Sequence, residues 1–123
     1  MYRLVFRNQE LGKSLLESGD PSIFTVSGEL IESGTAEDMS KWIMEEGGME
    51  DDGVFLLPLD NRFLVVLGEH TPVPFAQGSI ICVPDEDEIF LELEGIPAPE
   101  YSHFFTDHIE QYSSGGDEAP TIQ

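Results

Sequence analysis

A run of acidic side chains from Asp85 to Glu88 separates two apolar segments, and further carboxylates interrupt the second segment. In a strand, side chains at alternate positions share one face and lie about 6.6 Å apart. A strand over residues 88–94 therefore turns its leucine and isoleucine side chains to the core and a row of carboxylates outward. Such a row attracts lysine and arginine, and an aromatic among charges is a typical interface anchor. The expected outer row is Glu88, Phe90, Glu92 and Glu94, extended at the turn by Asp85 and Asp87.

A second acidic cluster follows the end of an expected helix. Acidic side chains at that end oppose the helix dipole, at a cost of about a few tenths of a kcal/mol each. The cluster is therefore either a contact surface for a basic partner or a solvated loop. Its candidate contacts are Glu50, Asp51 and Asp52. Trp42, about one helical turn earlier, is a further candidate, although a single tryptophan is more often part of a core.

Metal binding and catalysis have weaker support. His103, Asp107 and Glu110 share one face of an expected helix and are of types that bind zinc, but their spacing is also that of an ordinary polar helix face. Cys82 and His108 each lie in an apolar pattern, which indicates core positions. The chain contains no glycine-rich phosphate loop, GxSxG or HExxH motif. We therefore expect neither an enzyme nor a metal or other cofactor.

The composition is that of a folded but very acidic protein. The 123 residues include 25 Asp and Glu against five Lys and Arg, giving a net charge of −20, while 40% are hydrophobic. Phosphates would be repelled, so direct binding to nucleic acid or to an anionic membrane is disfavoured and a basic protein is the natural partner. Arg3, Arg7 and Lys13 form a mildly basic N-terminal region, with Glu10 as the one acid among the first 13 residues.

Location follows from cysteine content and hydropathy. Cys82 is the single cysteine, so no intrachain disulfide can form. The N-terminal residues lack the long apolar run of a secretory signal. The longest uncharged stretch, Thr71–Pro84, contains three prolines and is too short to cross a bilayer. We expect a soluble cytoplasmic protein.

The first third of the chain predicts two strands and a short helix. Alternation over Tyr2–Arg7 indicates a half-buried strand. Leu11, Leu15 and Leu16 predict a short helix that ends near Gly19. A second strand is expected over Ile23–Glu32, with Phe24, Val26 and Leu30 on its core face and Gly28 as a bulge.

The remaining elements are a capped helix, two hairpins and a C-terminal helix. Thr35 begins a helix that the Gly47-Gly48 pair ends. Apolar runs over Val54–Leu59 and Arg62–Leu67 around Asp60-Asn61 predict a hairpin. Ser79–Val83 and Glu88–Leu93 predict another hairpin around Pro84–Asp87. The strongest helical periodicity contains Tyr101, Phe104, Phe105, His108, Ile109 and Tyr112.

These elements predict a single α+β domain over residues 1–112, followed by a flexible acidic tail over 113–123. Its sheet would be mostly antiparallel, with about five or six strands and two or three helices, and the C-terminal helix would pack on the sheet.

The favoured function is a small acidic binding protein that neutralises a basic protein. An immunity protein, an antitoxin or an inhibitor that imitates the charge of nucleic acid would fit. Three alternatives stay open. The acids could protect an exposed sheet edge from aggregation, solvate a salt-adapted domain, or belong to an accessory or scaffold subunit of a larger assembly.

Overall fold

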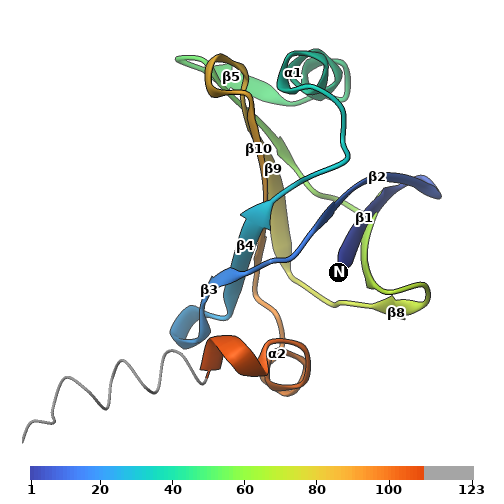
Figure 1. Ribbon diagram of the computed structural model, residues 1–123, viewed down its shortest axis with the longest axis vertical. Helices are drawn as coiled ribbons and strands as arrows, with labels where there is room; N and C mark the ends of the chain where they lie inside the picture. Colours follow the sequence, from blue (N-terminus) through green and yellow to red (C-terminus); the bar gives the residue numbers. More distant parts are fainter. Residues whose placement is uncertain (110–123) are drawn as a thin grey trace, which may run out of the picture.

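The computed structural model describes residues 1–109 as two antiparallel sheets with helices (Figure 1). The sheet that we name sheet A contains, in spatial order, β2 (Gln9–Ser14), β1 (Tyr2–Phe6), β7 (Phe63–Leu67) and β8 (Thr71–Pro72). Sheet B contains β3 (Ser18–Asp20), β4 (Thr25–Glu29), β10 (Glu88–Glu94), β9 (Gln77–Val83), β6 (Val54–Pro58) and β5 (Met49–Asp51). The helices are α1 (Ala36–Glu45) and α2 (Ala98–Phe104), with 3₁₀ turns η1 (Pro21–Ile23) and η2 (Pro84–Glu86).

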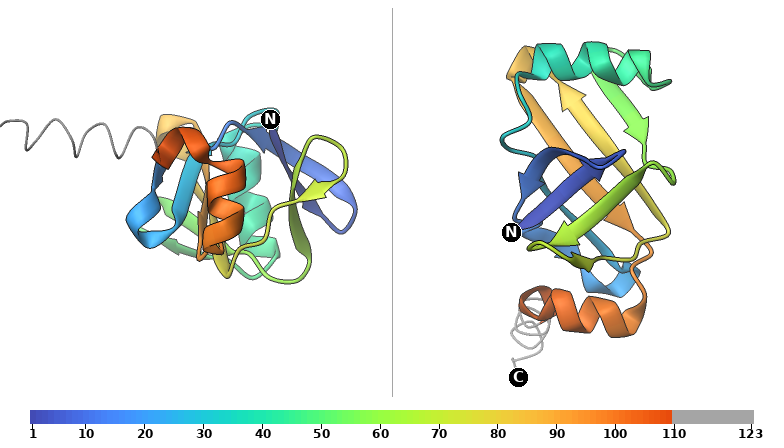
Figure 2. Two further views of the ribbon diagram at one scale, coloured as in Figure 1. Left: turned by 90° about the horizontal axis from the view of Figure 1, so that it is seen from below. Right: turned by 90° about the vertical axis from the view of Figure 1, so that its right-hand side faces the viewer.

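One face of sheet B carries the rest of the molecule. Figure 2 shows α1 across one end of the sheet, α2 across the other, and sheet A between them, all on the same side. The side chains that fill the space between these parts include Leu4, Leu16, Val26, Ile43, Ile80, Leu91, Leu93 and Ile96. The α+β class and the packing of the C-terminal helix on the sheet are thus confirmed, with the strands divided between two sheets.

The helix α1 forms where the local signals predict it. The Thr35 hydroxyl accepts a hydrogen bond from the Asp38 backbone N–H at 3.1 Å, which is an N-cap. Met39 and Ile43 are buried, so the apolar face of the helix packs on sheet B. Gly47 follows the helix with a φ of +95°, a conformation that costs glycine little.

The predicted helix over residues 11–19 is wrong, because this segment is extended. Arg7 and Asn8 both have positive φ and form a two-residue turn, so β1 and β2 make a hairpin with Phe6 opposite Gln9. Leu15 is 61% exposed whereas Leu16 is fully buried. Leu16 has a φ of +47°, which no right-handed helix contains, and its long-range burial overrides the helical spacing.

The hairpin predicted around Asp60-Asn61 is also wrong, although both of its strands exist. β6 pairs with β5 and β9 in sheet B, whereas β7 pairs with β1 and β8 in sheet A. The Asp60 carboxylate accepts the Arg62 backbone N–H at 2.9 Å and so forms a turn that carries the chain between sheets. The hairpin turn is instead Asp52-Gly53, where both residues have positive φ.

The hairpin of β9 and β10 is confirmed, with Glu88 opposite Val83 and η2 in the predicted turn. In β4, which pairs with β10, Val26 faces the core as expected, and Leu30, just beyond the strand, is also buried. Phe24 is not on the core face, since it is 39% exposed and has a left-handed backbone conformation that ends η1.

The C-terminal helical pattern is confirmed in its buried face but not as one continuous helix. Tyr101, Phe105 and His108 are buried, and the helix is interrupted at Phe105 before a further turn over residues 106–109. The Tyr101 hydroxyl donates to the Thr25 carbonyl at 2.9 Å, which ties α2 to β4. Tyr112 and the expected tail, residues 113–123, lie outside the described residues.

Gly28 is a point of close approach rather than a bulge. It pairs in register with Leu91, and a Cβ atom there would lie 2.6 Å from the Ser14 Oγ and 2.9 Å from the Leu16 backbone nitrogen. The segment that leaves sheet A therefore crosses directly over β4. A larger residue at this position would push the two layers apart.

Replacing Gly28 with alanine should lower the free energy of unfolding by about 1–3 kcal/mol, because the added methyl group overpacks the crossing. Urea unfolding at fixed ionic strength measures the loss. Ser27→Ala on the opposite face of the same strand is the control and should change stability by less than about 0.5 kcal/mol. Equal unfolding midpoints for both variants would contradict the close crossing.

Candidate protein-binding face

The two acidic clusters of the sequence meet at one end of sheet B. Phe55 pairs with Cys82, so the turn after β5 lies beside the turn after β9. A Cβ atom on Gly53 would lie 4.0 Å from the Asp85 Oδ2. We name this group the acidic end. Its members are Glu50, Asp51, Asp52, Asp85, Glu86, Asp87 and Glu88.

Two of these carboxylates also hold the backbone. The Glu50 Oε2 accepts the Gly53 N–H at 2.9 Å and so closes the hairpin turn. The Asp87 Oδ1 accepts the Ala36 N–H at 3.3 Å, at the N-terminus of α1, where a negative charge is favourable. For the remaining five, the structure of residues 1–109 contains no ion pair and no hydrogen bond from the side chain to the backbone.

The outer row of β10 lies where alternation predicts it. Ile89, Leu91 and Leu93 are buried. On the opposite face, Glu88, Phe90 and Glu92 are partly exposed and Glu94 is exposed. The row therefore points away from the core.

An apolar band crosses the same outer face. Strand register places Phe90 beside Ile81, Ile81 beside Leu56, and Leu56 beside Met49. Met49 is 57% exposed, and the other three are partly exposed. Glu29 follows Phe90 on the next strand, so the band ends at a carboxylate. The outer face thus offers apolar contact area with acidic side chains beside it.

No helix among residues 1–109 covers this face. Figure 1 shows sheet B nearly edge-on, with sheet A on one side and the opposite side open along β4, β10 and β9. A half-exposed sheet face with an aromatic and aliphatic band is a surface on which another protein can dock.

Like charges crowd at one point of the acidic end. The pKa of Glu88 is raised by a hydrogen bond with Glu86, and then by partial burial and by the charges of Glu86 and Glu29. The raised pKa of Glu88 stabilises the folded state at pH values below the ordinary pKa of a glutamate. This stabilisation is lost as the pH rises through the raised pKa. At neutral pH the pair is mutually repulsive, and a cation placed between the carboxylates would relieve the repulsion.

Trp42 does not belong to this face. Its ring makes edge contacts with Phe6 at 5.1 Å and Phe63 at 6.4 Å between centroids. It packs toward sheet A, on the covered side of sheet B. The structure thus places Trp42 away from the outer face of sheet B, and its contact with a partner stays a prediction.

Four of the five basic residues lie on or next to sheet A, and the fifth, Lys41, lies on α1. Arg3 forms an ion pair with Glu10 at 3.3 Å, and Lys13 with Glu32 at 3.4 Å. Arg62, just before β7, binds Glu46 at 2.8 Å and Asp60 at 2.9 Å. Since these three cations are paired there, they do not offset the charge of the acidic end.

Residues suited to covalent or metal chemistry are not assembled in the described part. The Cys82 Sγ is fully buried and lies 3.1 Å from the Ala36 carbonyl oxygen. His108 is buried between Tyr101 and Phe105. Within residues 1–109, no group of three or more His, Cys, Asp or Glu side chains is placed to bind a metal ion. Glu110, the third member of the metal candidate, lies outside the described residues.

The apolar band is the part of the site that sequence reasoning missed. Met49 and Leu56 reach the face only because β5 and β6 form a hairpin that joins β9. The signal for that hairpin was present in Asp52-Gly53, which is a stronger two-residue turn than Asp60-Asn61.

Replacing Glu86 with glutamine should lower the pKa of Glu88 toward its ordinary value, because the neighbouring charge is removed. Carboxyl carbon shifts followed by NMR over a pH series measure the change. Glu94→Gln, two positions beyond Glu92 on the same row, is the control and should leave the Glu88 titration unchanged. A Glu88 pKa that does not move in Glu86→Gln would contradict the close pairing.

Burial, with a smaller contribution from Asp87, raises the pKa of Cys82 from 9.0 to about 11. The thiol should therefore react with Ellman's reagent at pH 8 only after unfolding in urea. The raised pKa also means that stability from the protonated thiol is lost as the pH rises from about 9 to about 11. Rapid labelling of the native protein at pH 8 would disprove this burial.

Comparison with known proteins adds no assignment to this geometry. No family model, curated protein or solved structure matches the chain. In the described part, none of the helices has both the length and the apolar composition needed to cross a membrane.

Proposed function

We propose that the protein binds a basic protein through the outer face of sheet B and its acidic end, and thereby neutralises that partner. The observation that carries this proposal is the meeting of two acidic turns beside an uncovered apolar band. Such a molecule would act as an immunity protein, an antitoxin or an inhibitor that imitates the charge of nucleic acid.

The two parts of the face have different energetic roles. Carboxylates that stay exposed contribute about 0–1 kcal/mol per ion pair, so they chiefly speed and orient the encounter. Phe90 and Ile81 supply area that loses water on contact, which is where most of the affinity of an interface resides. A partner with an apolar residue surrounded by lysine and arginine would match both parts.

The distribution of charge favours this function over solvation alone. Seven of the 25 acids lie in two adjacent turns or at the strand ends beside them, and the structure adds Glu29 and Glu92 on the outer face. A surface shaped only for solubility gains nothing from such crowding, because like charges repel. Salt adaptation and service as a scaffold subunit remain as outcomes that the following experiment separates.

The test compares capture by three forms of the full-length protein. A site variant combines Asp52→Asn, Asp85→Asn and Glu92→Gln, and asparagine suits the left-handed backbone at position 52. A control variant combines Glu17→Gln, Glu69→Gln and Glu118→Gln, which changes the net charge equally. Each immobilised form is exposed to native lysate at low salt and eluted with a salt gradient, and the proteins are identified by mass spectrometry.

We expect the unaltered form and the control to retain the same basic protein to a defined salt step, and the site variant to lose it. Three exposed charges at about 0.2–1 kcal/mol each predict a loss in affinity of about threefold to a hundredfold. Equal losses in both variants, or only a smear of cationic proteins, would mean that the charge serves solvation. Retention unaffected by either variant would indicate a scaffold contact elsewhere.

A further inference from the structure

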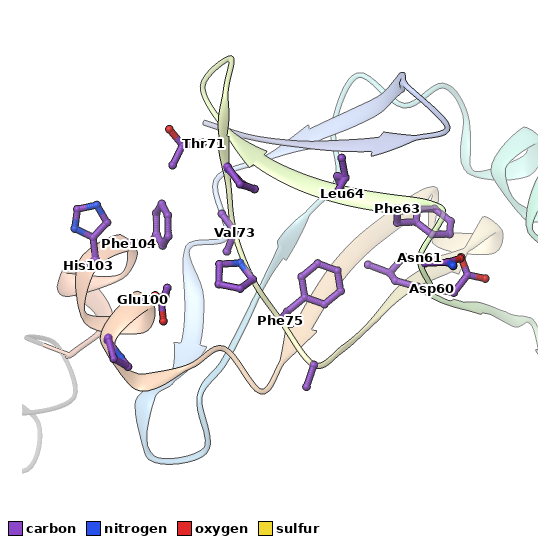
Figure 3. Close-up of a pocket in the computed structure, with 15 residues that line it drawn as sticks. Asp60, Asn61, Phe63, Leu64, Thr71, Val73, Phe75, Glu100, His103 and Phe104 are labelled. Carbon is purple, nitrogen blue, oxygen red and sulfur yellow. The ribbon is translucent and has the colours of Figure 1, made fainter.

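A cleft of about 830 Å³ lies away from the acidic end, between sheet A and α2. Figure 3 shows Phe104 and His103 projecting from α2 at one side, Phe63 at the other, and Phe75 between them. The volume falls within the range of sites that bind small ligands or peptide side chains, about 300–1,000 Å³.

The walls of the cleft are held in place before any ligand arrives. The Tyr2 hydroxyl donates to the Phe104 carbonyl at 3.2 Å, which fixes α2 against β1. The segment between β8 and β9 is tied at both ends, by Val73 N–H to the Val65 carbonyl at 2.8 Å and by Ala76 N–H to the Glu94 carbonyl at 2.9 Å. A preformed site loses little conformational entropy on binding.

The lining is mostly apolar, and its polar members are Asp60, Asn61, Thr71, Glu100 and His103. Leu64 is 54% exposed in the cleft wall, and the lining contains no lysine or arginine. Asp60 lines the far end, but Arg62 already pairs with it at 2.9 Å and lowers the pKa of its carboxyl. Glu100 makes no ion pair within residues 1–109 and lies at the α2 end, opposite Asp60 (Figure 3).

We propose that this cleft binds a short apolar peptide segment that carries a lysine or arginine at one end. The apolar side chains would lie along Phe75 and Phe104, and the cation would approach Glu100. An anionic ligand would meet the negative lining and the net charge of −20. The site uses residues outside the acidic end, so it stands or fails separately from the proposed function.

The probes are three acetylated and amidated pentapeptides. Lys-Leu-Phe-Leu-Lys carries a cation at each end and therefore tests both binding directions. Glu-Leu-Phe-Leu-Glu has the same apolar core with opposite charge, and Lys-Ser-Gly-Ser-Lys has the charge without the core. Each is titrated into isotopically labelled full-length protein, and the shifts of the backbone amides are followed by NMR.

Two lysine substitutions at exposed strand positions separate the cleft from the acidic end. Leu64→Lys puts a cation in the cleft. Val54 is 39% exposed, and Val54→Lys puts a cation beside the acidic end. Leu64→Lys should weaken the first peptide at least about tenfold and Val54→Lys by less than about twofold. Glu100→Gln should weaken it by up to about fivefold.

The proposal is supported if the cationic apolar peptide shifts the amides of residues 73–76 and 99–104, and the two control peptides bind at least about tenfold more weakly. Equal binding of the anionic peptide would overturn the choice of ligand. Shifts confined to residues 50–53 and 84–88, or no shift at millimolar peptide, would overturn the site. The capture experiment of the proposed function is repeated with the same two variants. Capture of a basic protein that persists in Leu64→Lys and is lost in Val54→Lys would support the proposed function and not the cleft.

Discussion

The central strand β10 has to serve the core and the surface at once, and the rest of the structure follows from this constraint. It pairs with β9 along its whole length and with β4 over residues 90–93, so it is an interior strand of sheet B. Its inward residues, among them Leu91 and Leu93, belong to the core cluster that also contains side chains of α1, sheet A and α2. Its outward residues, which include Phe90 and Glu92, therefore form part of the open face of sheet B.

Charge is sorted between the two sides of the molecule in the same way. Three of the five Lys and Arg residues take part in ion pairs on or near sheet A, and the Arg7 guanidinium lies 5.3 Å from the Phe6 ring centroid. The acidic end stays strongly negative because four of the five cations lie elsewhere, Lys41 on α1 being the exception. A cluster of like charges of this kind attracts cations toward that end of sheet B.

Local signals predicted what local interactions determine. Thr35 and Gly47 bound α1 as expected, the β9–β10 hairpin forms around its predicted turn, and alternation placed the β10 row outward. The prediction of a helix over residues 11–19 failed because the direction of the Leu16 side chain depends on a crossing over Gly28 that no local pattern reveals. The sequence predicts one hairpin from β6 and β7 because a two-residue turn does not specify which sheet each strand joins. The apolar band and the cleft need several segments that are distant in the sequence, so only the fold assembles them.

The order of synthesis gives the pairing of β10 a further consequence. β4 and β6 emerge long before β10 and β9, which complete sheet B between them. During that interval, strands with open edges are exposed to other nascent chains, and such edges promote aggregation. Carboxylates such as Glu29 on β4 and Asp51 on β5 are already in place at that stage. Their mutual repulsion opposes association between unfinished copies of the chain, so the carboxylates of the outer face and the acidic end also act before the fold is complete.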